Sequence, residues 1–419
     1  METRYNISDI FRLGRAEWPG GLSDEQYSVL NLIAQCRTGV LGELECWCNR
    51  CGYSEVVPQS CGNRHCPNCL ESRQAKWSER VCRRLPAAKH FHMVFTVPPE
   101  LAEVMRAEPK AFLGLFFEVV AEVLKTFAKN NWKGDGGFLA VLHTWGQTLQ
   151  WHPHLHVLVS GGRLDHVSGR WKKAPPRSLH DIRNLSKVYR GIFLNRLEKL
   201  GKSGTFPWPA HLKCGASRAA WLRRLSRPVW RIHIEPPLRH TRAVVRYLAR
   251  YTSRVAISNQ RIVEFDPEAA TVRFSYKDNR QGGRRKEMTL PVGQFTARFA
   301  QHILPKGFQR IRYFGFLNPG SAHYRSPALP SATAQLERAF ERHPCPRCGN
   351  TNWTHLPRSG SLGPREGHPP RSPSLQTPVA EGFGSVSLLS SRAPPGRGHK
   401  PVQQVVGVDA GHPQPALRA

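Results

Sequence analysis

Apolar residues recur at helical spacing in two stretches of the N-terminal third of the chain. Residues 29–33 form one apolar face, and Ser23 precedes Gln26 in the pattern of a capping box, which predicts a helix near the N-terminus. The longer apolar stretch 111–128 also contains Glu118, Glu122 and Lys125. These charges predict an amphipathic core helix and argue against a membrane span.

Between residue 90 and about residue 317, short β-like runs alternate with longer helical ones. Strands are expected at residues 91–97, 138–143, 154–159, 230–234 and 271–276. Helices are expected at residues 111–129, 179–200 and 239–252. This alternation predicts an α+β sheet domain.

The segments on either side of this domain differ from it in character. A cysteine-rich module precedes it, and the basic amphipathic pattern of residues 71–85 predicts a helix that leaves the module. After Cys348, Pro, Gly and Ser dominate without apolar periodicity, which predicts disorder. We therefore expect a helix plus zinc-binding, DNA-contacting module at 1–89, the α+β domain at 90–320 and a disordered tail at 321–419.

The charge of the chain narrows the class of partner. Its 419 residues include 61 Lys and Arg against 30 Asp and Glu, a formal net charge of +31. Such an excess indicates a polyanion, with nucleic acid first and membrane headgroups or a merely solvated surface as alternatives. The N-terminus lacks the basic-then-apolar order of a secretory signal, so we expect a cytoplasmic, nucleoid-associated bacterial protein.

Two basic segments with glycine at turn positions, 279–285 and 304–312, are expected to contact phosphates. In the second, cations alternate with apolar and aromatic residues, a pattern that suits bases stacking beside neutralised phosphates. The predicted DNA contacts here are Lys306, Arg310 and Arg312.

Seven of the eleven cysteines lie between Cys36 and Cys69, which indicates metal binding in a reducing compartment. Two C-x2-C pairs, fourteen residues apart, predict one structural Zn²⁺ site; they are Cys48 with Cys51 and Cys66 with Cys69. A second zinc would draw on Cys36, Cys46, Cys61 and His65. A further ribbon could begin at Cys345 and Cys348, completed by His343 or His355. Because four ligands close a zinc site, we expect this module to shape a DNA-binding surface without doing chemistry.

Three histidines alternate with other residues in the apolar run around residue 155. On a strand, His154 and His156 point to one face and can present two imidazoles to one cation, whereas His152 lies at the strand start. Two imidazoles rarely hold a divalent ion alone. The third ligand is expected to be His92, with His143, Gln147 and His152 as alternatives.

Two tyrosines share one face of the helix expected at 239–252. Tyr247 and Tyr251 are four residues apart, and Arg246 and Arg250 repeat that spacing beside them as predicted DNA contacts. A phenol becomes an effective nucleophile when a metal ion polarises the phosphate that it attacks. The alternative interpretation is that both rings only pack in a core or interface.

These features occur in the order of a known family. The segments concerned are 61–69, 143–147, 152–156, 247–251, 255–258 and 304–308. Over residues 30 to 320 the chain resembles the rolling-circle insertion-sequence transposases of the HUH, two-tyrosine class, the IS91 family.

The resemblance implies a ferredoxin-like antiparallel sheet with the paired histidines on a central strand. It implies that His154 and His156 hold Mg²⁺ or Mn²⁺, and that Tyr247 or Tyr251 attacks single-stranded DNA at the transposon ends. The product would be a 5′-phosphotyrosine and a free 3′-hydroxyl, ready for transfer to target DNA without ATP. Two features depart from the family pattern: Ser253 stands where the family has a larger polar residue, and the tail differs from the family's C-terminal region.

Three other classes of protein share part of this pattern. A histidine-triad nucleotide hydrolase fits residues 152–156 but does not require the charge, the cysteines or the tyrosines. A non-catalytic zinc-ribbon protein would bind DNA and leave it uncut. A plasmid replication initiator or relaxase would use the same chemistry. The sequence leaves open the DNA ends, the oligomeric state and which tyrosine attacks first.

Overall fold

The computed structural model describes residues 5–70, 77, 81, 85–165, 167–174, 182–204, 206, 208–235, 255–323 and 344–357. The helix expected at 239–252, with its two tyrosines, lies outside these ranges, and so does most of the helix expected at 71–85. Within them, no helix combines the length and the apolar character that crossing a membrane requires.

Two short helices open the chain, α1 (Ile7–Leu13) and α2 (Asp24–Ala34). The capping box expected at α2 is confirmed, because the Ser23 side chain accepts from the Gln26 backbone and the Gln26 side chain accepts from the Ser23 backbone. Their apolar faces pack with a later helix, α9 (Val292–Ala300).

The main sheet is antiparallel throughout, in the order β11-β4-β5-β3-β7, with β6 paired to β5. Its strands are β3 (His90–Thr96), β4 (Gly134–Trp145), β5 (Trp151–Asp165), β6 (Trp171–Lys173), β7 (Ile232–Ile234) and β11 (Ile311–Gly315). The connections run strand, helices, strand, strand, helices, strand from β3 to β7. This is the ferredoxin-like topology, and the predicted α+β class with an antiparallel sheet is confirmed.

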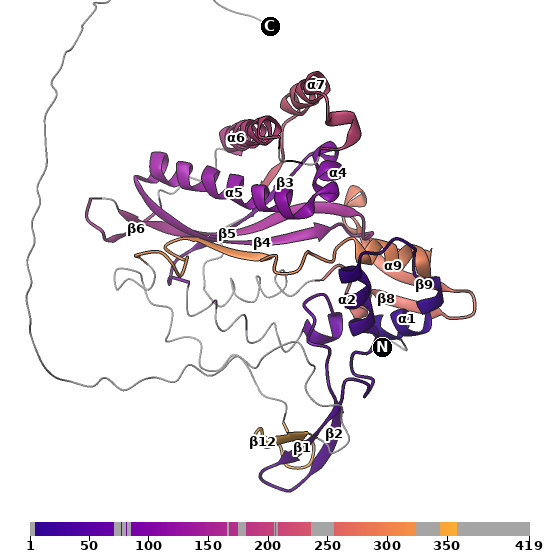
Figure 1. The fold of residues 1–419 in the computed structure, drawn as a ribbon. Coiled ribbons are helices and arrows are strands. Elements are labelled where there is room, and N and C mark those ends of the chain that lie inside the picture. Colours follow the sequence, from indigo (N-terminus) through magenta and orange to yellow (C-terminus); the bar gives the residue numbers. More distant parts are fainter. Residues whose placement is uncertain are drawn as a thin grey trace, which may run out of the picture. The chain divides into compact units, whose positions relative to one another are not determined.

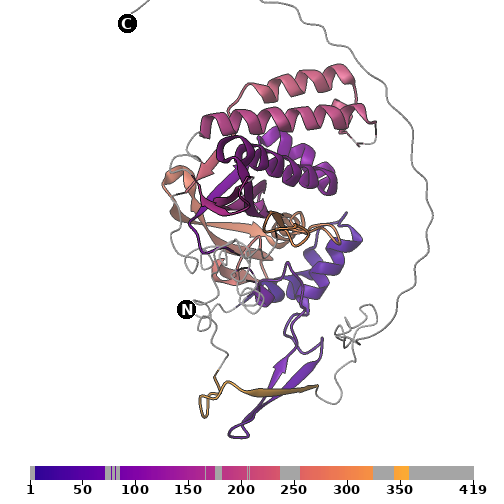
Figure 2. The ribbon, with the colours of Figure 1, turned by 90° about the vertical axis from the view of Figure 1, so that its left-hand side faces the viewer.

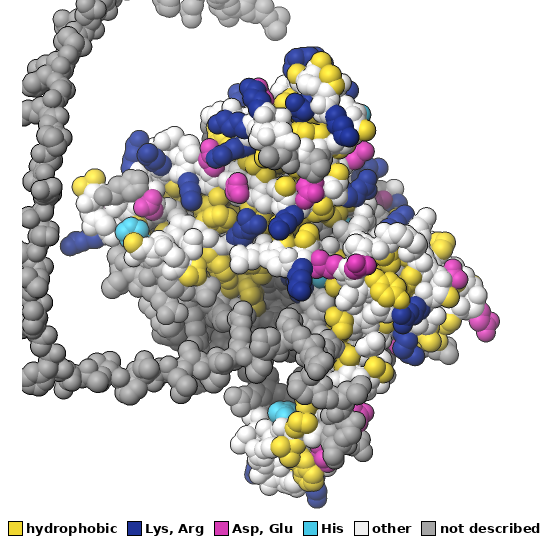
Figure 3. Space-filling model, viewed as in Figure 1, with side chains coloured by type: hydrophobic (Ala, Val, Ile, Leu, Met, Phe, Trp, Pro, Cys, Tyr) yellow, Lys and Arg dark blue, Asp and Glu magenta, His cyan; other side chains and the backbone are white. Residues whose placement is uncertain are grey.

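Helices cover one face of this sheet, with α5 between the strands and α6 (Figures 1 and 2). The layer consists of α4 (Pro99–Ala107), α5 (Pro109–Phe127), α6 (Ile182–Lys202) and α7 (Gly215–Ser226). Leu155 and Val157 of β5 contribute to the core beneath them, together with Phe116 of α5. Since neighbouring residues of a strand face opposite ways, His154 and His156 lie on the face away from the helices. In the view of Figure 3, Lys and Arg side chains gather over α6 and α7.

A second antiparallel sheet has the order β10-β9-β8 and packs with α9 and α1. Its strands are β8 (Ile262–Asp266), β9 (Thr271–Asp278) and β10 (Arg284–Pro291). The turn between β9 and β10 contains Gly282 and Gly283, whose φ angles of 64° and 83° favour glycine. This turn is the first of the two basic segments expected from the sequence.

A third sheet, β12-β1-β2, joins distant parts of the chain (Figure 1). Its strands are β1 (Glu43–Cys48), β2 (Ser54–Pro58) and β12 (Trp353–Pro357). The sequence places residues 344–357 in the predicted tail, whereas in the structure β12 pairs along β1 from Leu44 to Cys48. Short 3-10 or π segments complete the described elements: Arg15–Glu17, Pro67–Cys69, Ala128–Trp132, Ala210–Leu212, Asn259–Arg261 and Asn279–Gln281.

Candidate active site

Three histidines converge on the face of the main sheet away from the helices. His143 of β4 is the register partner of His154 on β5, and His156 follows two positions later. One ring nitrogen from each lies within 4.8 Å of the others, a spacing that suits coordination of one cation. The sequence named His143 only as an alternative. Because side chains alternate along β4, its register with β5 decides that His143 faces the pair.

His92, the expected third ligand, lies behind His156 instead. Its Nε2 is 2.9 Å from His156 Nδ1, and its Nδ1 is 3.3 Å from Glu235 Oε1. A carboxylate only accepts, so His92 donates from Nδ1 to Glu235 and accepts at Nε2 from His156 Nδ1. This chain of contacts fixes the His156 tautomer, with the proton on Nδ1, so that Nε2 is the nitrogen that can offer a lone pair to a cation.

His154 is held in the same tautomer by the backbone. Its Nδ1 donates to the carbonyl oxygen of His152 at 2.7 Å, which leaves Nε2 as the free nitrogen. Burial lowers the pKa of His154 to about 4, and burial also lowers the pKa of His92. Both imidazoles are therefore neutral at physiological pH, as a metal ligand and its orienting partner must be.

The histidines line an open cavity of about 690 Å³. The end of β9 and the following turn also line it, through residues that include Tyr276, Lys277 and Arg280. Lys277 and Arg280 are exposed, whereas Tyr276 is half-buried. The cavity thus combines four imidazoles, that of His152 included, with a phenol and two cations. The carboxylate of Asp278 also lines it but is paired with Lys286 at 2.8 Å, so the cations can still face a phosphate-bearing ligand. Tyr276 was not singled out in the sequence, because a lone strand tyrosine gives no signal of its own.

The cysteines form two groups of four, and in each the sulfur atoms lie within 4.8 Å of one another. The first contains Cys36, Cys61, Cys66 and Cys69, and the second contains Cys48, Cys51, Cys345 and Cys348. The expected joining of one C-x2-C pair to the other was wrong. Cys36 and Cys61 lie at the base of the β1–β2 hairpin, whereas Cys48, the last residue of β1, and Cys51 lie at its tip, so the length of β1 separates the two ends.

The other candidate zinc ligands that the structure describes lie outside both groups, and His343 is not among the described residues. The Nε2 of His65 faces Arg64 Nε at 3.2 Å and the backbone nitrogen of Leu304 at 3.4 Å, and burial lowers the pKa of His65 well below its usual value. Cys46 Sγ lies 3.1 Å from His355 Nδ1, directly across the β1–β12 pair. The alternative in which His355 completes the group of Cys345 and Cys348 is therefore wrong.

Comparison with known proteins decides the family. A family model described as "Transposase zinc-binding domain" matches residues 10–97, and one described as "Putative transposase" matches residues 137–325. The y4qJ protein of Sinorhizobium fredii, named as a transposase, is 39% identical over 320 residues, which are 74% of this chain and 80% of that protein. The transposase of insertion sequence element IS801 from Pseudomonas savastanoi pv. phaseolicola is 32% identical over 71% of this chain and 72% of its own length.

The chain belongs to the IS91 family of transposases. The predicted family is thereby confirmed, with its zinc-binding module. Among solved structures, a conjugative relaxase in complex with oriT DNA is 16% identical over 40% of the transposase and 67% of the relaxase, with a TM-score of 0.23.

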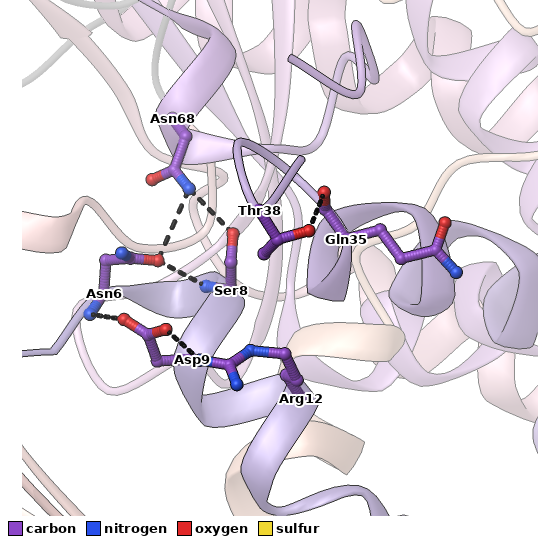
Figure 4. A network of polar contacts seen from close by, with 7 residues as sticks. All are labelled: Asn6, Ser8, Asp9, Arg12, Gln35, Thr38 and Asn68. Atoms are coloured by element: carbon purple, nitrogen blue, oxygen red, sulfur yellow. Dashed lines mark hydrogen bonds and ion pairs between the residues drawn. The ribbon is translucent and has the colours of Figure 1, made fainter. Parts of the chain in front are cut away.

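The first cysteine group of the transposase is anchored to its N-terminal helix (Figure 4). Asn68, between Cys66 and Cys69, donates to Ser8 Oγ at 2.7 Å and to Asn6 Oδ1 at 3.4 Å. Asn6 also caps α1 through the Ser8 backbone nitrogen. The cysteine loop and the helix start thereby orient one another.

Arg64 connects the cysteine module to the sheet domain. Its guanidinium donates to the carbonyl oxygens of Leu304, Pro305 and Phe308, and Phe308 packs in the main core. The segments 61–69 and 304–308, which the resemblance singled out separately, are therefore in direct contact. The guanidinium of Arg64 thus joins the two segments at this junction.

The predicted DNA contacts are placed unequally. Lys306 is exposed, and its backbone nitrogen donates to Glu25. Arg310 is half-buried. The guanidinium of Arg312 lies 4.4 Å from the centre of the Phe117 ring, so this cation is engaged in packing. The remaining predicted residues, Arg246, Arg250 and the two tyrosines, lie outside the described ranges.

Proposed function

We propose that this transposase cuts one DNA strand by metal-dependent attack of a tyrosine, the HUH reaction of rolling-circle transposition. The observation that carries the proposal is the convergence of His143, His154 and His156 on the wall of an open cavity. Family membership and the net charge of +31 support DNA as the substrate. Single-stranded transposon ends and target DNA are the proposed partners.

The residues of the cavity fit a divalent cation. Three imidazoles from two neighbouring strands leave coordination positions open toward the cavity, as a catalytic centre requires. When bound, Mg²⁺ or Mn²⁺ would polarise the scissile phosphate. Because the ligand set is imidazole and not carboxylate, it favours a transition-metal ion over Mg²⁺.

The protein side chains then have distinct tasks. Lys277 and Arg280 neutralise the phosphates of the strand that enters the cavity, and the ring of Tyr276 offers a stacking surface for a base. Tyr247 or Tyr251 is the proposed nucleophile. Its phenolic oxygen forms a bond to phosphorus, the bond from phosphorus to the 3′-oxygen breaks, and the phenolic proton passes to that oxygen.

The test is covalent capture of DNA. The protein is incubated with a labelled single-stranded oligonucleotide carrying the end of its element, with Mn²⁺, with Mg²⁺ or with EDTA, and the products are separated on denaturing gels. We expect a protease-sensitive adduct that EDTA abolishes and that is lost in His154→Ala/His156→Ala and in Tyr247→Phe/Tyr251→Phe. DNA binding without any adduct in the wild-type protein would favour the non-catalytic zinc-ribbon alternative.

A relaxase or replication initiator would give the same adduct. Strand transfer separates these functions from transposition. The adduct formed on a transposon end is supplied with a second, unrelated single strand, and joining of the two strands indicates a transposase.

A further inference from the structure

The second group of cysteines brings together parts of the chain that are far apart in sequence. Cys48 is the last residue of β1 and Cys51 follows it, whereas Cys345 and Cys348 precede β12. Cys48 Sγ lies 3.6 Å from Cys348 Sγ, and Cys51 Sγ lies 3.7 Å from Cys345 Sγ, across 300 and 294 sequence positions. The two family models end at residues 97 and 325, so Cys345 and Cys348 belong to neither matched region.

The separations of the sulfur atoms identify the kind of contact. A disulfide requires about 2.05 Å, which both pairs exceed widely. Four thiolates about 2.3 Å from one zinc ion form a tetrahedron whose edge is about 3.8 Å. The first cysteine group shows the same spacing, 3.6 Å between Cys36 and Cys69. With sulfur alone at its corners, the second group suits a soft or borderline ion and does not suit Mg²⁺ or Ca²⁺.

The backbone repeats one turn at both halves of the group. Each half has the sequence Cys-x-Arg-Cys-Gly, from Cys48 to Gly52 and from Cys345 to Gly349. In each, the glycine nitrogen donates to the carbonyl oxygen of the first cysteine, at 3.0 and 2.8 Å. Both glycines have positive φ, 68° and 72°, which the turn requires. Two equal knuckles facing one another are the geometry of a zinc ribbon.

Apart from the cysteine group, few contacts within the described part of the chain hold residues 344–357 in place. Four of the five residues of β12 are exposed, and Cys345 is the one buried apolar residue of the segment. Polar contacts with Asn49 and the pairing of β12 with β1 add specificity. A short exposed strand of this kind is marginal in water, so a metal ion would supply the missing stabilisation.

We propose that Cys48, Cys51, Cys345 and Cys348 bind a second structural zinc ion, which fastens the segment after the nuclease domain onto the β1–β2 hairpin. This site is separate from the one formed by Cys36, Cys61, Cys66 and Cys69. Neither half binds zinc alone, because each supplies only two ligands. The ion therefore closes the chain around the whole sheet domain, and its removal releases residues 344–357.

Zinc content of the full-length protein tests the proposal. After gel filtration without chelator, we expect two zinc ions per wild-type chain and one in Cys345→Ser/Cys348→Ser. We expect one also in Cys48→Ser/Cys51→Ser and, decisively, still one when all four changes are combined. Cys214→Ser is the matched control, since Cys214 is exposed and belongs to neither group, and it should retain two ions. One zinc in the wild type, or a further loss in the combined variant, would overturn the shared site.

A measurement on the wild-type protein avoids dependence on the folding of variants. Alkylation is followed by peptide mass spectrometry while a chelator is titrated. We expect Cys214 to react at once and the four cysteines of the second group to become reactive together, in one step with faster hydrogen exchange at residues 353–357. Independent reactivity of the two halves, or a disulfide between them in unreduced peptides, would contradict the proposal.

Discussion

His92 Nε2 lies 2.9 Å from His156 Nδ1, so the histidine expected to bind the catalytic metal contacts one of the three proposed ligands. The distinction between His92 and His143 can be measured. His143→Ala should abolish metal-dependent cleavage at every metal concentration, because it removes a ligand. His92→Gln should raise the Mn²⁺ concentration for half-maximal cleavage by about 10- to 100-fold and leave the rate at saturation largely intact.

Glu235→Gln should behave like His92→Gln, with a smaller effect, because an amide still accepts from His92 Nδ1. Titration of adduct formation with Mn²⁺ measures all three variants. His211→Gln, at an exposed histidine of the Ala210–Leu212 turn, is the control and should match the wild type. The opposite result would assign the metal ligand to His92: no adduct from His92→Gln at any Mn²⁺ concentration, and wild-type adduct formation by His143→Ala at high Mn²⁺.

Lys277 and Arg280 should determine how strongly single-stranded DNA binds at the cavity. Each alanine variant is expected to reduce affinity at low salt and to lower the salt dependence of binding by about one phosphate contact. Fluorescence anisotropy across a range of NaCl concentrations gives both quantities. Arg170→Ala, at an exposed position in the β5–β6 turn, is the charge-matched control. If the salt dependence of DNA affinity is the same in the wild type and in both cavity variants, Lys277 and Arg280 do not contact the phosphates.

Acid should destabilise the fold through its buried histidines. Burial lowers the pKa of His90 and of His302 from the ordinary value of 6.5 to about 4. Between pH 6.5 and pH 4 these two histidines therefore bind protons in the unfolded chain but not in the folded chain. Their contribution to the free energy of unfolding is complete above pH 6.5 and is lost as the pH falls toward 4. The expected loss between pH 7 and pH 5 is about 2 kcal/mol per histidine.

Urea midpoints at pH 7 and pH 5 test this dependence in the wild type and in His302→Gln. The variant should lose about 2 kcal/mol less than the wild type over this range, whatever its stability at pH 7. Zinc release from the cysteines affects both proteins alike and cancels in the comparison. If the wild type and His302→Gln lose the same free energy of unfolding between pH 7 and pH 5, His302 does not contribute to the pH dependence.

Arg64 should contribute to stability through the carbonyl oxygens that it satisfies. Arg64→Ala leaves three carbonyls of residues 304–308 without this donor and is expected to cost about 3 kcal/mol in urea unfolding. Arg12→Ala is the control, since Arg12 makes an exposed ion pair with Asp9 in the same helix and should change stability by less than about 0.5 kcal/mol. A loss of DNA binding at unchanged stability would assign Arg64 to the DNA surface instead.

The sequence predicted elements well where one periodicity dominates. The strand at β5, the long helix α5 and the capping box of α2 follow from local pattern alone. Local pattern also placed His154 and His156 on one face, because strand alternation is a property of neighbouring residues.

Local sequence pattern could not predict which residues distant in sequence come together in the fold. Whether His92 or His143 completes the histidine group depends on which neighbouring strand presents a side chain to the same face as His154 and His156. The joining of Cys48 to Cys348 depends on a hairpin and on a strand about 300 residues later. Spacing between C-x2-C pairs favoured the nearer pair, since loop closure is easier over a short distance, but the β1–β2 hairpin carries Cys48 away from Cys66.

The central claim is that a tyrosine of the segment 247–251 attacks DNA, and peptide mapping of the adduct tests it most directly. Trypsin cuts after Arg246, Arg250 and Arg273, so Tyr247, Tyr251 and Tyr276 fall on three different peptides. We predict that the 5′-phosphorylated nucleotide remains on the peptide of Tyr247 or of Tyr251. A nucleotide on the peptide of Tyr276, the phenol that lines the histidine cavity, would contradict the assignment of the nucleophile.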